Sequence, residues 1–368
     1  MMNKYQARFG LLLTVFLLFC VQLDAGSKNR SGTAGAQELM IPVGSGATAM
    51  AGSNVAGISG IEAVEWNIAG LAQIGGTGEA MFSRATWLDE IGVSYFGIAS
   101  ALGGKNVFGI TFKSLDFGDI PVTTMEATAG TGENFSPSYV NIGFLYARKM
   151  TDRISFGFDF KIVSETIMKE SASGAILDAG VQYASSSNGL RIGASLKNLG
   201  LNMIFTGSDL EEFLDPFGTD PGTPTEPRRI TLQEFEMPTT LELGVSYGPI
   251  NLGPAHVLLS GSFLNNNFYF DEYRFGVQVN MMDILYLRSG LAIGFDPEPY
   301  GADGVQDTKD DSADDQYEYS SEEFIWGPSF GFGLDLTKLT GLGLSVDYAY
   351  RTAEYFDGVS WITIKAAF

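Results

Sequence analysis

The side chains best suited to chemistry lie in one acidic stretch near the end of the chain. Residues 296–323 contain eleven Asp or Glu and a single lysine, Lys309. Carboxylates are the ligands that calcium prefers, and the candidates for weak divalent-ion binding are Asp303, Asp307, Asp310 and Asp311. Their spacing does not follow the EF-hand loop. The stretch therefore predicts a solvated surface loop, with weak ion binding as the alternative and no dedicated metal site or cofactor.

Catalytic groups are sparse elsewhere in the sequence. His256 is the only histidine, and a Ser–His–acid mechanism would need a positioned serine and acid beside it. The sequence indicates neither. The one cysteine, Cys20, lies in an apolar run close to the N-terminus, so a chain processed beyond it has no thiol nucleophile, disulfide or Cys-ligated metal. We therefore predict no catalytic residue and no enzyme activity.

The N-terminus has the three parts of a secretory signal. Two basic residues precede an apolar run from Phe9 to Val21, and Ala25 is a small residue at a plausible cleavage point. A transmembrane anchor is the alternative, but the run is shorter than the roughly 20 residues that a spanning helix needs. A lipoprotein signal at Cys20 is disfavoured by the bulky Phe19 before it. We expect residues 1–25 to be a cleaved signal peptide.

The charge balance excludes two further classes. The chain has 43 acidic and 22 basic residues, for a formal net charge of −21. A nucleic-acid binder needs a basic footprint, and a peripheral protein held by anionic lipid needs one too. No later apolar run approaches the length of a transmembrane helix, so a membrane location would require a closed β-barrel, which alone satisfies the backbone of strands in lipid.

Alternation of large apolar with small or polar residues is the dominant pattern. In the clearest case, Ile154 to Ile162, five large apolar residues share one face, and Ser155, Gly157, Asp159 and Lys161 share the other. About fourteen such segments occur, and an even count is typical of bacterial barrels. They lie near 79–86, 90–101, 108–112, 138–149, 154–162, 174–185, 190–197, 241–247, 255–266, 269–281, 284–295, 325–336, 342–351 and 358–368. The sequence favours an all-β, antiparallel transmembrane barrel over a secreted soluble sandwich.

The connections between these segments are of two kinds, as in outer-membrane barrels. Most are short turns, but 118–136, 200–237 and 296–324 are long and polar. Four prolines in 208–236 predict an irregular excursion, either a partner contact or a disordered cap. The candidate partner residues in it are Asp209, Glu211, Glu212, Arg228 and Arg229.

Further expectations follow from a barrel. The alternation places charged side chains in the lumen, where we expect them to pair and brace the wall rather than form a substrate path. These residues are Asp159, Lys161, Glu242, Asp347 and Arg351, and His256 would face the lumen or lie at a rim. Aromatic residues near strand ends could form interface girdles or pack internally: Trp87, Tyr146, Tyr183, Tyr247, Tyr269, Trp326 and Trp361. The chain ends on an aromatic residue, Phe368, which resembles the C-terminal signal of outer-membrane barrels.

Ahead of the strands lies a short helical stretch, EAVEWNIAGLAQ, from Glu62 to Gln73. Asn67 is suited to cap a helix at Ile68 to Ala72, and Trp66 is a large anchor whose indole N–H needs a polar partner. A barrel of fourteen strands is wider than its own side chains can fill. We therefore expect residues 26–75 to enter the lumen as a hatch and residues 76–368 to form the barrel. The expected hatch residues are Trp66, Asn67, Ile68, Gly70 and Leu71.

Several blocks of the sequence resemble the PorV/PorQ family of outer-membrane proteins, which are related to the FadL fatty-acid transporters. The blocks include Met40-Ile41-Pro42-Val43-Gly44, Trp66-Asn67-Ile68-Ala69-Gly70-Leu71-Ala72, Ser195-Leu196-Lys197-Asn198-Leu199-Gly200 and Val346-Asp347-Tyr348-Ala349-Tyr350. Ile68 stands where the family has proline. The resemblance implies a FadL-like barrel of about fourteen strands in the bacterial outer membrane, with an N-terminal plug.

The resemblance leaves two functions open. PorV-type proteins serve type IX secretion, in which they bind the C-terminal domains of exported cargo and carry it from the translocon. FadL-type proteins instead let hydrophobic small molecules such as fatty acids cross passively. We favour the first because the blocks look more like PorV/PorQ than like FadL. A plugged lumen beneath polar loops would favour partner binding, and an apolar pocket near the outer rim would favour transport.

Overall fold

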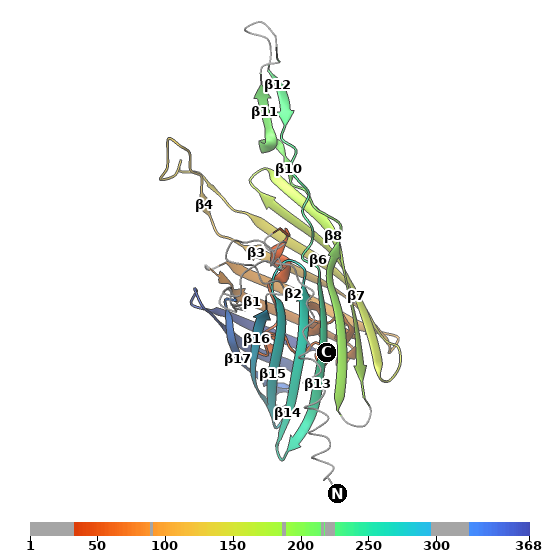
Figure 1. The fold of residues 1–368 in the computed structure, drawn as a ribbon. Helices are drawn as coiled ribbons and strands as arrows, with labels where there is room; N and C mark the ends of the chain where they lie inside the picture. Colours follow the sequence, from red (N-terminus) through yellow and green to blue (C-terminus); the bar gives the residue numbers. More distant parts are fainter. Residues whose placement is uncertain (1–32, 89–90, 186–188, 215–216, 218–224, 296–323) are drawn as a thin grey trace, which may run out of the picture.

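The structure, a computed structural model, describes residues 33–88, 91–185, 189–214, 217, 225–295 and 324–368. Fourteen strands of this described part form one antiparallel sheet that closes into a barrel through the β1–β19 ladder (Figure 1). The barrel strands are β1 (Gly78–Thr86), β2 (Gly92–Leu102), β3 (Asn106–Asp116), β6 (Ser138–Lys149), β7 (Ile154–Ile167), β8 (Glu170–Ala184), β9 (Leu190–Gly200), β13 (Thr240–Leu252), β14 (Ala255–Asn266), β15 (Asp271–Met281), β16 (Leu285–Phe295), β17 (Trp326–Asp335), β18 (Gly343–Ala353) and β19 (Val359–Ala367). The predicted fold class and strand number are confirmed.

The two faces of each strand have opposite character. On β7, the exposed side chains of Phe158, Phe160 and Ile162 point out of the barrel, while Asp159 and Lys161 are buried on the inside. Large apolar side chains are exposed in the same way on the other strands, as lipid contact requires. The chain is therefore an outer-membrane barrel. Among the described residues, no helix is long and apolar enough to cross a bilayer.

The two ends of the barrel differ in their connections. Short turns such as 103–105, 253–254 and 282–284 lie at one end, together with the start of β1 and the end of β19. We call this end the turn rim. The opposite end carries the long connections 117–137, 201–239 and 296–325, and we call it the loop rim. By analogy with other outer-membrane barrels, the loop rim faces outward and the turn rim faces the periplasm.

The long loops contain more regular structure than the sequence predicted. A small hairpin, β4 (Ile120–Pro121) with β5 (Asn134–Phe135), occupies the first. In the second, β10 (Thr206–Gly207) pairs antiparallel with the start of β8. β11 (Glu211–Leu214) pairs with β12 (Glu226–Arg229) in a ribbon that projects from the loop rim (Figure 1). The prediction that prolines exclude regular structure here was wrong. Pro227 lies in β12. A strand of a two-stranded ribbon has one free edge, and a proline whose nitrogen faces that edge costs the ladder no hydrogen bond.

Candidate functional site

The N-terminal segment, residues 33–75, runs through the inside of the barrel. Its helical turns are η2 (Gln37–Met40), α2 (Ser45–Thr48), η3 (Ile61–Glu65) and η4 (Ile68–Gln73). At the loop rim, the N–H of Gly35 donates to the carbonyl of Glu236 at 3.1 Å. At the turn rim, the N–H of Thr77 donates to the carbonyl of Phe368 at 2.8 Å. The segment thus crosses the lumen from one rim to the other before β1 begins.

The stretch around Trp66 and Asn67 is buried. The Oδ1 of Asn67 accepts a hydrogen bond from the N–H of Ala69 at 3.1 Å, which caps η4. Its Nδ2 donates to the carbonyl of Val55 at 3.0 Å and to that of Val181 on the wall at 3.2 Å. Because both groups of the amide are used, one side chain ties the cap to a second part of the segment and to the barrel.

The other expected hatch residues lie around this cap. The Trp66 indole N–H donates to the carbonyl of Val43 at 3.2 Å, and Ile68 and Leu71 are fully buried. A side chain at Gly70 would meet the carbonyl oxygen of Ile58 at 2.3 Å, so only glycine fits there. Ile68, where the family has proline, is at the first helical position and fills space against the wall.

Glycines on the inner wall allow this close approach. A Cβ added to Gly290 would lie 2.2 Å from the carbonyl carbon of Met50, and one added to Gly157 would lie 2.7 Å from the carbonyl oxygen of Ile68. The wall therefore accepts the backbone of the segment directly, without intervening side chains.

Ion pairs also fasten the segment to the wall on the turn side. Glu62 of η3 lies 2.7 Å from Lys365 of β19, and its Oε1 accepts from the N–H of Ala47 at 2.9 Å. Lys365 also pairs with Asp347 at 3.0 Å, and Asp347 pairs with Arg288 at 2.5 Å. Glu62 thus joins a charged network that spans the wall strands β19, β18 and β16 through Lys365, Asp347 and Arg288.

Next to this network is a polar cavity of about 370 Å³ on the turn side. Its charged lining comprises Glu62, Arg191, Arg288, Asp335, Asp347 and Lys365, and Gln278 and Asn280 add amide groups. A hydrophobic solute would bind poorly here, because it would displace the water that hydrogen-bonds to the polar groups and could not replace those hydrogen bonds. This turn-side cavity is therefore a largely polar space.

A second buried charged group lies beside η4 on the opposite wall. Lys161 pairs with Asp178 at 2.5 Å, and Lys113 pairs with Glu65 of the segment at 3.3 Å. The expectation that Lys161, Glu242 and Asp347 pair inside the lumen is confirmed; Glu242 lies 3.4 Å from Arg274. The prediction was wrong for two residues. Neither the carboxylate of Asp159 nor the Nε and Nη2 of Arg351 has a hydrogen-bond partner in the described part of the chain.

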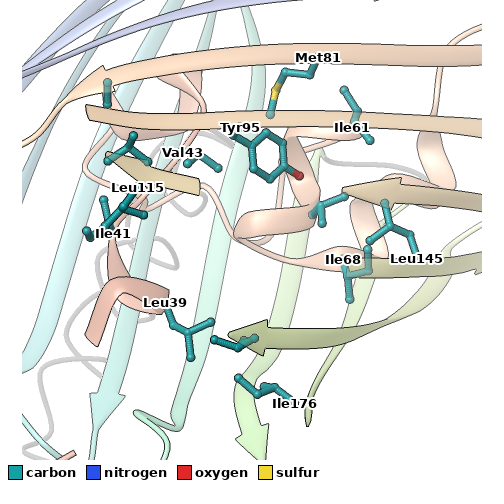
Figure 2. Close-up of a cluster of buried hydrophobic side chains, with 14 of the residues drawn as sticks. Leu39, Ile41, Val43, Ile61, Ile68, Met81, Tyr95, Leu115, Leu145 and Ile176 are labelled. Carbon is teal, nitrogen blue, oxygen red and sulfur yellow. The ribbon is translucent and has the colours of Figure 1, made fainter. Parts of the chain in front are cut away.

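The loop half of the lumen has a different lining. Large apolar side chains from the wall and the 201–239 loop surround the first part of the segment, where Leu39, Ile41 and Val43 fill the centre (Figure 2). We call this group the upper apolar cluster. Its wall members include Val93, Tyr95, Leu115, Tyr139, Val163, Ile176, Met203, Met237, Val359 and Trp361. The apolar cluster also continues along the β1–β8 side to Met81, Val107 and Leu145 near the turn rim, whereas the polar cavity is lined mainly by β13–β19. The chain itself occupies the upper part of the apolar cluster.

The aromatic residues follow only part of the girdle prediction. Tyr146 packs against Phe108 at 5.1 Å on the outer face near the turn rim. Trp361 is 0 % exposed, and its indole N–H donates to the carbonyl of Pro42 at 2.9 Å inside the barrel. Trp87 and Trp326 pack with it near the loop rim. Of the two alternatives, internal packing holds for Trp361, because its strand position faces inward with Val359 and Thr363.

The predicted partner residues lie on the projecting ribbon or beside it. Glu211 and Arg229 form a pair at 2.6 Å across the β11–β12 ladder, and Asp209 lies 3.3 Å from Lys169. Glu212 and Arg228 are opposite each other in the same ladder. The structure brings these residues together far from the hatch residues.

The structure bears on one of the remaining candidates for chemistry, His256, and leaves the acidic stretch untested. His256 lies at the turn side, in contact with Asn251 at 2.7 Å and at the edge of the polar cavity, as predicted for a lumen or rim residue. No cluster of metal-binding side chains occurs among the described residues. The acidic stretch with Asp303, Asp307, Asp310 and Asp311 lies outside them.

Sequence reasoning missed the residues that fasten the segment to the wall. Lys365 alternates with Ile362 and Ile364 on the last strand, which would have placed it inside. Glu62 and Glu65 are two acids within an otherwise apolar stretch, a sign of paired buried charges. Arg288 gave no comparable signal.

Comparison with known proteins supports the fold. No protein-family model and no curated protein matches the sequence. The solved structure of the monoaromatic hydrocarbon channel CymD aligns over 89% of this chain and 98% of its own, with 13% identity and a TM-score of 0.50. The toluene transporter TodX of Pseudomonas putida aligns over 87% of this chain and 95% of its own, again with 13% identity and a TM-score of 0.50. A FadL homologue of Pseudomonas aeruginosa covers similar lengths at 12% identity, with a TM-score of 0.48.

Proposed function

We propose that this chain, which has the fold of two hydrocarbon channels, is a non-enzymatic outer-membrane channel for hydrophobic small molecules. The observation that carries the proposal is the upper apolar cluster, which gives the outward half of the lumen the lining that an apolar solute needs. Transfer of an apolar group from water to such a lining is favourable by about 25 cal/mol per Å². The printed names of the two neighbours, which concern toluene and monoaromatic hydrocarbons, point to the same substrate class.

The N-terminal segment would act as the plug. Leu39, Ile41 and Val43 occupy the upper apolar cluster, so a solute can enter only when they move. Residues 26–75 would form this plug after export and removal of residues 1–25, and residues 76–368 the barrel. Because the turn-side cavity is polar, a hydrophobic solute would leave sideways into the membrane rather than continue through that cavity.

One place in the wall suits a sideways exit. The β8–β9 ladder shifts register between Leu177 and Ala179, and Asn198 has a left-handed backbone with φ of 59°. The Oδ1 of Asp178 accepts from the N–H of Asn198 at 2.7 Å, in place of a ladder bond. The wall is thus locally held by a side chain.

Uptake of labelled toluene and oleate by cells that express the chain tests this function. Expression should raise uptake of one or both. Ile176→Glu should abolish the gain because it places a charge in the upper apolar cluster, whereas Asn280→Asp in the turn-side cavity should leave it unchanged. Uptake that does not exceed that of cells without the chain, with the barrel present in the membrane, would contradict the proposal.

A second candidate is partner binding in type IX secretion, which the PorV/PorQ resemblance suggests. The observation that favours it is the β11–β12 ribbon, which projects from the loop rim and exposes 64% of Phe213 (Figure 1). Pull-down from detergent-solubilised outer membrane followed by mass spectrometry tests it. Recovery of translocon components, or of cargo with C-terminal sorting domains, would support it. Recovery of lipid alone would count against it.

A further inference from the structure

Arg351 differs from the other inward-facing arginines of the barrel. It lies on β18 two residues before the strand ends at the loop rim, and it is 8 % exposed. Arg274 and Arg288 each contact a carboxylate, at 2.8 and 2.5 Å. The Nε and Nη2 of Arg351 have no hydrogen-bond partner within the part of the chain that the structure describes. An unpaired buried polar group costs about 1–3 kcal/mol, and a charged one costs more. An acceptor at this position would therefore be stabilising.

The neighbouring charges do not provide that acceptor. Glu272 and Arg274 of β15 are the charged groups that act most strongly on Arg351. The Oε2 of Glu272 is engaged by the Nε of Arg274 at 2.8 Å, and Glu242 contacts the same arginine. Each glutamate thus gives one oxygen to Arg274, and the Nε and Nη2 of Arg351 have no hydrogen-bond partner among the described residues.

The free edge has a specific shape. The N–H groups of Nε and Nη2 lie side by side on one edge of a guanidinium and point in the same direction. That edge matches the two oxygens of a carboxylate, which accept two parallel hydrogen bonds from it. A single hydroxyl or carbonyl oxygen would satisfy only one of the two donors.

Aromatic rings border the same guanidinium. Its Cζ lies 4.7 Å from the centre of the Trp326 ring. Trp87 lies 5.1 Å from Trp326 and 6.0 Å from Trp361, so three of the four tryptophans of the chain are in contact in one group. Trp87 and Trp326 are half-buried, whereas Trp361 is covered. Flat aromatic faces favour a flat aromatic ligand, which stacks at ring distances of about 4.5–7 Å.

We infer that Arg351, Trp326 and Trp87 form a site for an aromatic carboxylate at the outward mouth of the barrel. The carboxylate would accept from the Nε and Nη2 of Arg351, and the ring would pack on the two tryptophans. This inference rests on the proposed function only for the outward orientation of the loop rim. It extends the substrate class from neutral hydrophobic molecules to aryl acids, which a plain apolar lining would reject because of their charge.

Tryptophan fluorescence of the purified full-length barrel in detergent tests the site. Titration with benzoate, toluene and hexanoate separates an aryl carboxylate from its ring alone and from a carboxylate on an aliphatic chain. Benzoate should quench the emission with saturation and bind at least 10-fold more tightly than hexanoate. Arg351→Met should weaken benzoate binding about 10- to 150-fold, because hydrogen bonds to a charged group contribute about 1.5–3 kcal/mol. Arg351→Lys, which keeps the charge but loses the two-donor edge, should lose most of the affinity as well.

Arg84→Met is the matched control, because Arg84 is an exposed wall arginine that contacts Ser94 away from the tryptophans. Unchanged benzoate affinity in a folded Arg351→Met barrel would overturn the inference, and so would equal affinity for hexanoate. Uptake of toluene, measured in the same variants, should not depend on Arg351. Loss of benzoate binding with intact toluene uptake, or the reverse, therefore separates this site from the proposed function.

Discussion

A single methyl group on the inner wall should loosen the plug. The Cβ of Gly290→Ala would lie 2.2 Å from the carbonyl carbon of Met50 and 2.5 Å from the N–H nitrogen of Ala51. Both are backbone atoms, so no rotamer change relieves the clash. Restoring a normal contact of about 3.5 Å requires the segment to retreat by about 1.3 Å. Overpacking of this kind costs about 1–3 kcal/mol.

That cost falls on the docked plug. If the barrel keeps its shape, the population with a displaced segment rises about 5- to 150-fold, since each 1.4 kcal/mol is a factor of ten. Single-channel conductance in planar bilayers should detect this as brief openings that the unaltered chain rarely shows. Limited proteolysis within residues 45–60 should become faster in parallel.

The matched control is Gly261→Ala on β14. The nearest heavy atom to its added Cβ would be 3.6 Å away, an ordinary contact, so conductance should stay at the level of the unaltered chain. Retained heat-modifiable migration would show that both variants are folded barrels. Equal conductance and equal proteolysis in the two variants would refute the view that backbone contact with the wall holds the plug.

Two further substitutions probe how the segment is held. Asn67→Ala removes the η4 cap and two donated hydrogen bonds, which together contribute about 2–3 kcal/mol. Hydrogen exchange of residues 67–73 should therefore become faster. Unchanged exchange would contradict the capping role. Glu62→Gln removes the charge that faces Lys365 at 2.7 Å. It should weaken docking by about 1.5–3 kcal/mol at most, because Lys365 retains Asp347; a conductance no higher than that of the unaltered chain would show that this ion pair does not hold the plug.

The sequence predicted the barrel well because its signal is local. Alternation along a strand, as from Ile154 to Ile162, follows from lipid on one side and a filled lumen on the other, so each strand reveals itself separately. The capping role of Asn67 could also be predicted from the sequence, since a cap depends only on the few residues after it. The strand positions of Lys161 and Asp347 likewise placed them inside.

Contacts between distant segments could not be read from the sequence. The pairing of Glu62 with Lys365 joins residues 303 positions apart, and it depends on how the segment threads a lumen that only the closed barrel creates. Position near a strand end left open whether Trp361 faces the membrane interface or packs internally, and the closed barrel decides for internal packing. The β11–β12 ribbon was missed because proline was taken to exclude a strand, although an edge tolerates it.

The most direct test of the account is to lock the plug and measure transport. The Oγ of Ser45 lies 2.7 Å from the Oγ1 of Thr363 on β19, close enough for a disulfide in Ser45→Cys with Thr363→Cys, made in a Cys20→Ala background. Uptake of labelled toluene and oleate should fall to the level of cells without the chain when the disulfide is formed, and a membrane-permeant reductant should restore it. Uptake that is the same before and after reduction, with the disulfide verified, would contradict the claim that solutes pass through the lumen when the N-terminal segment moves.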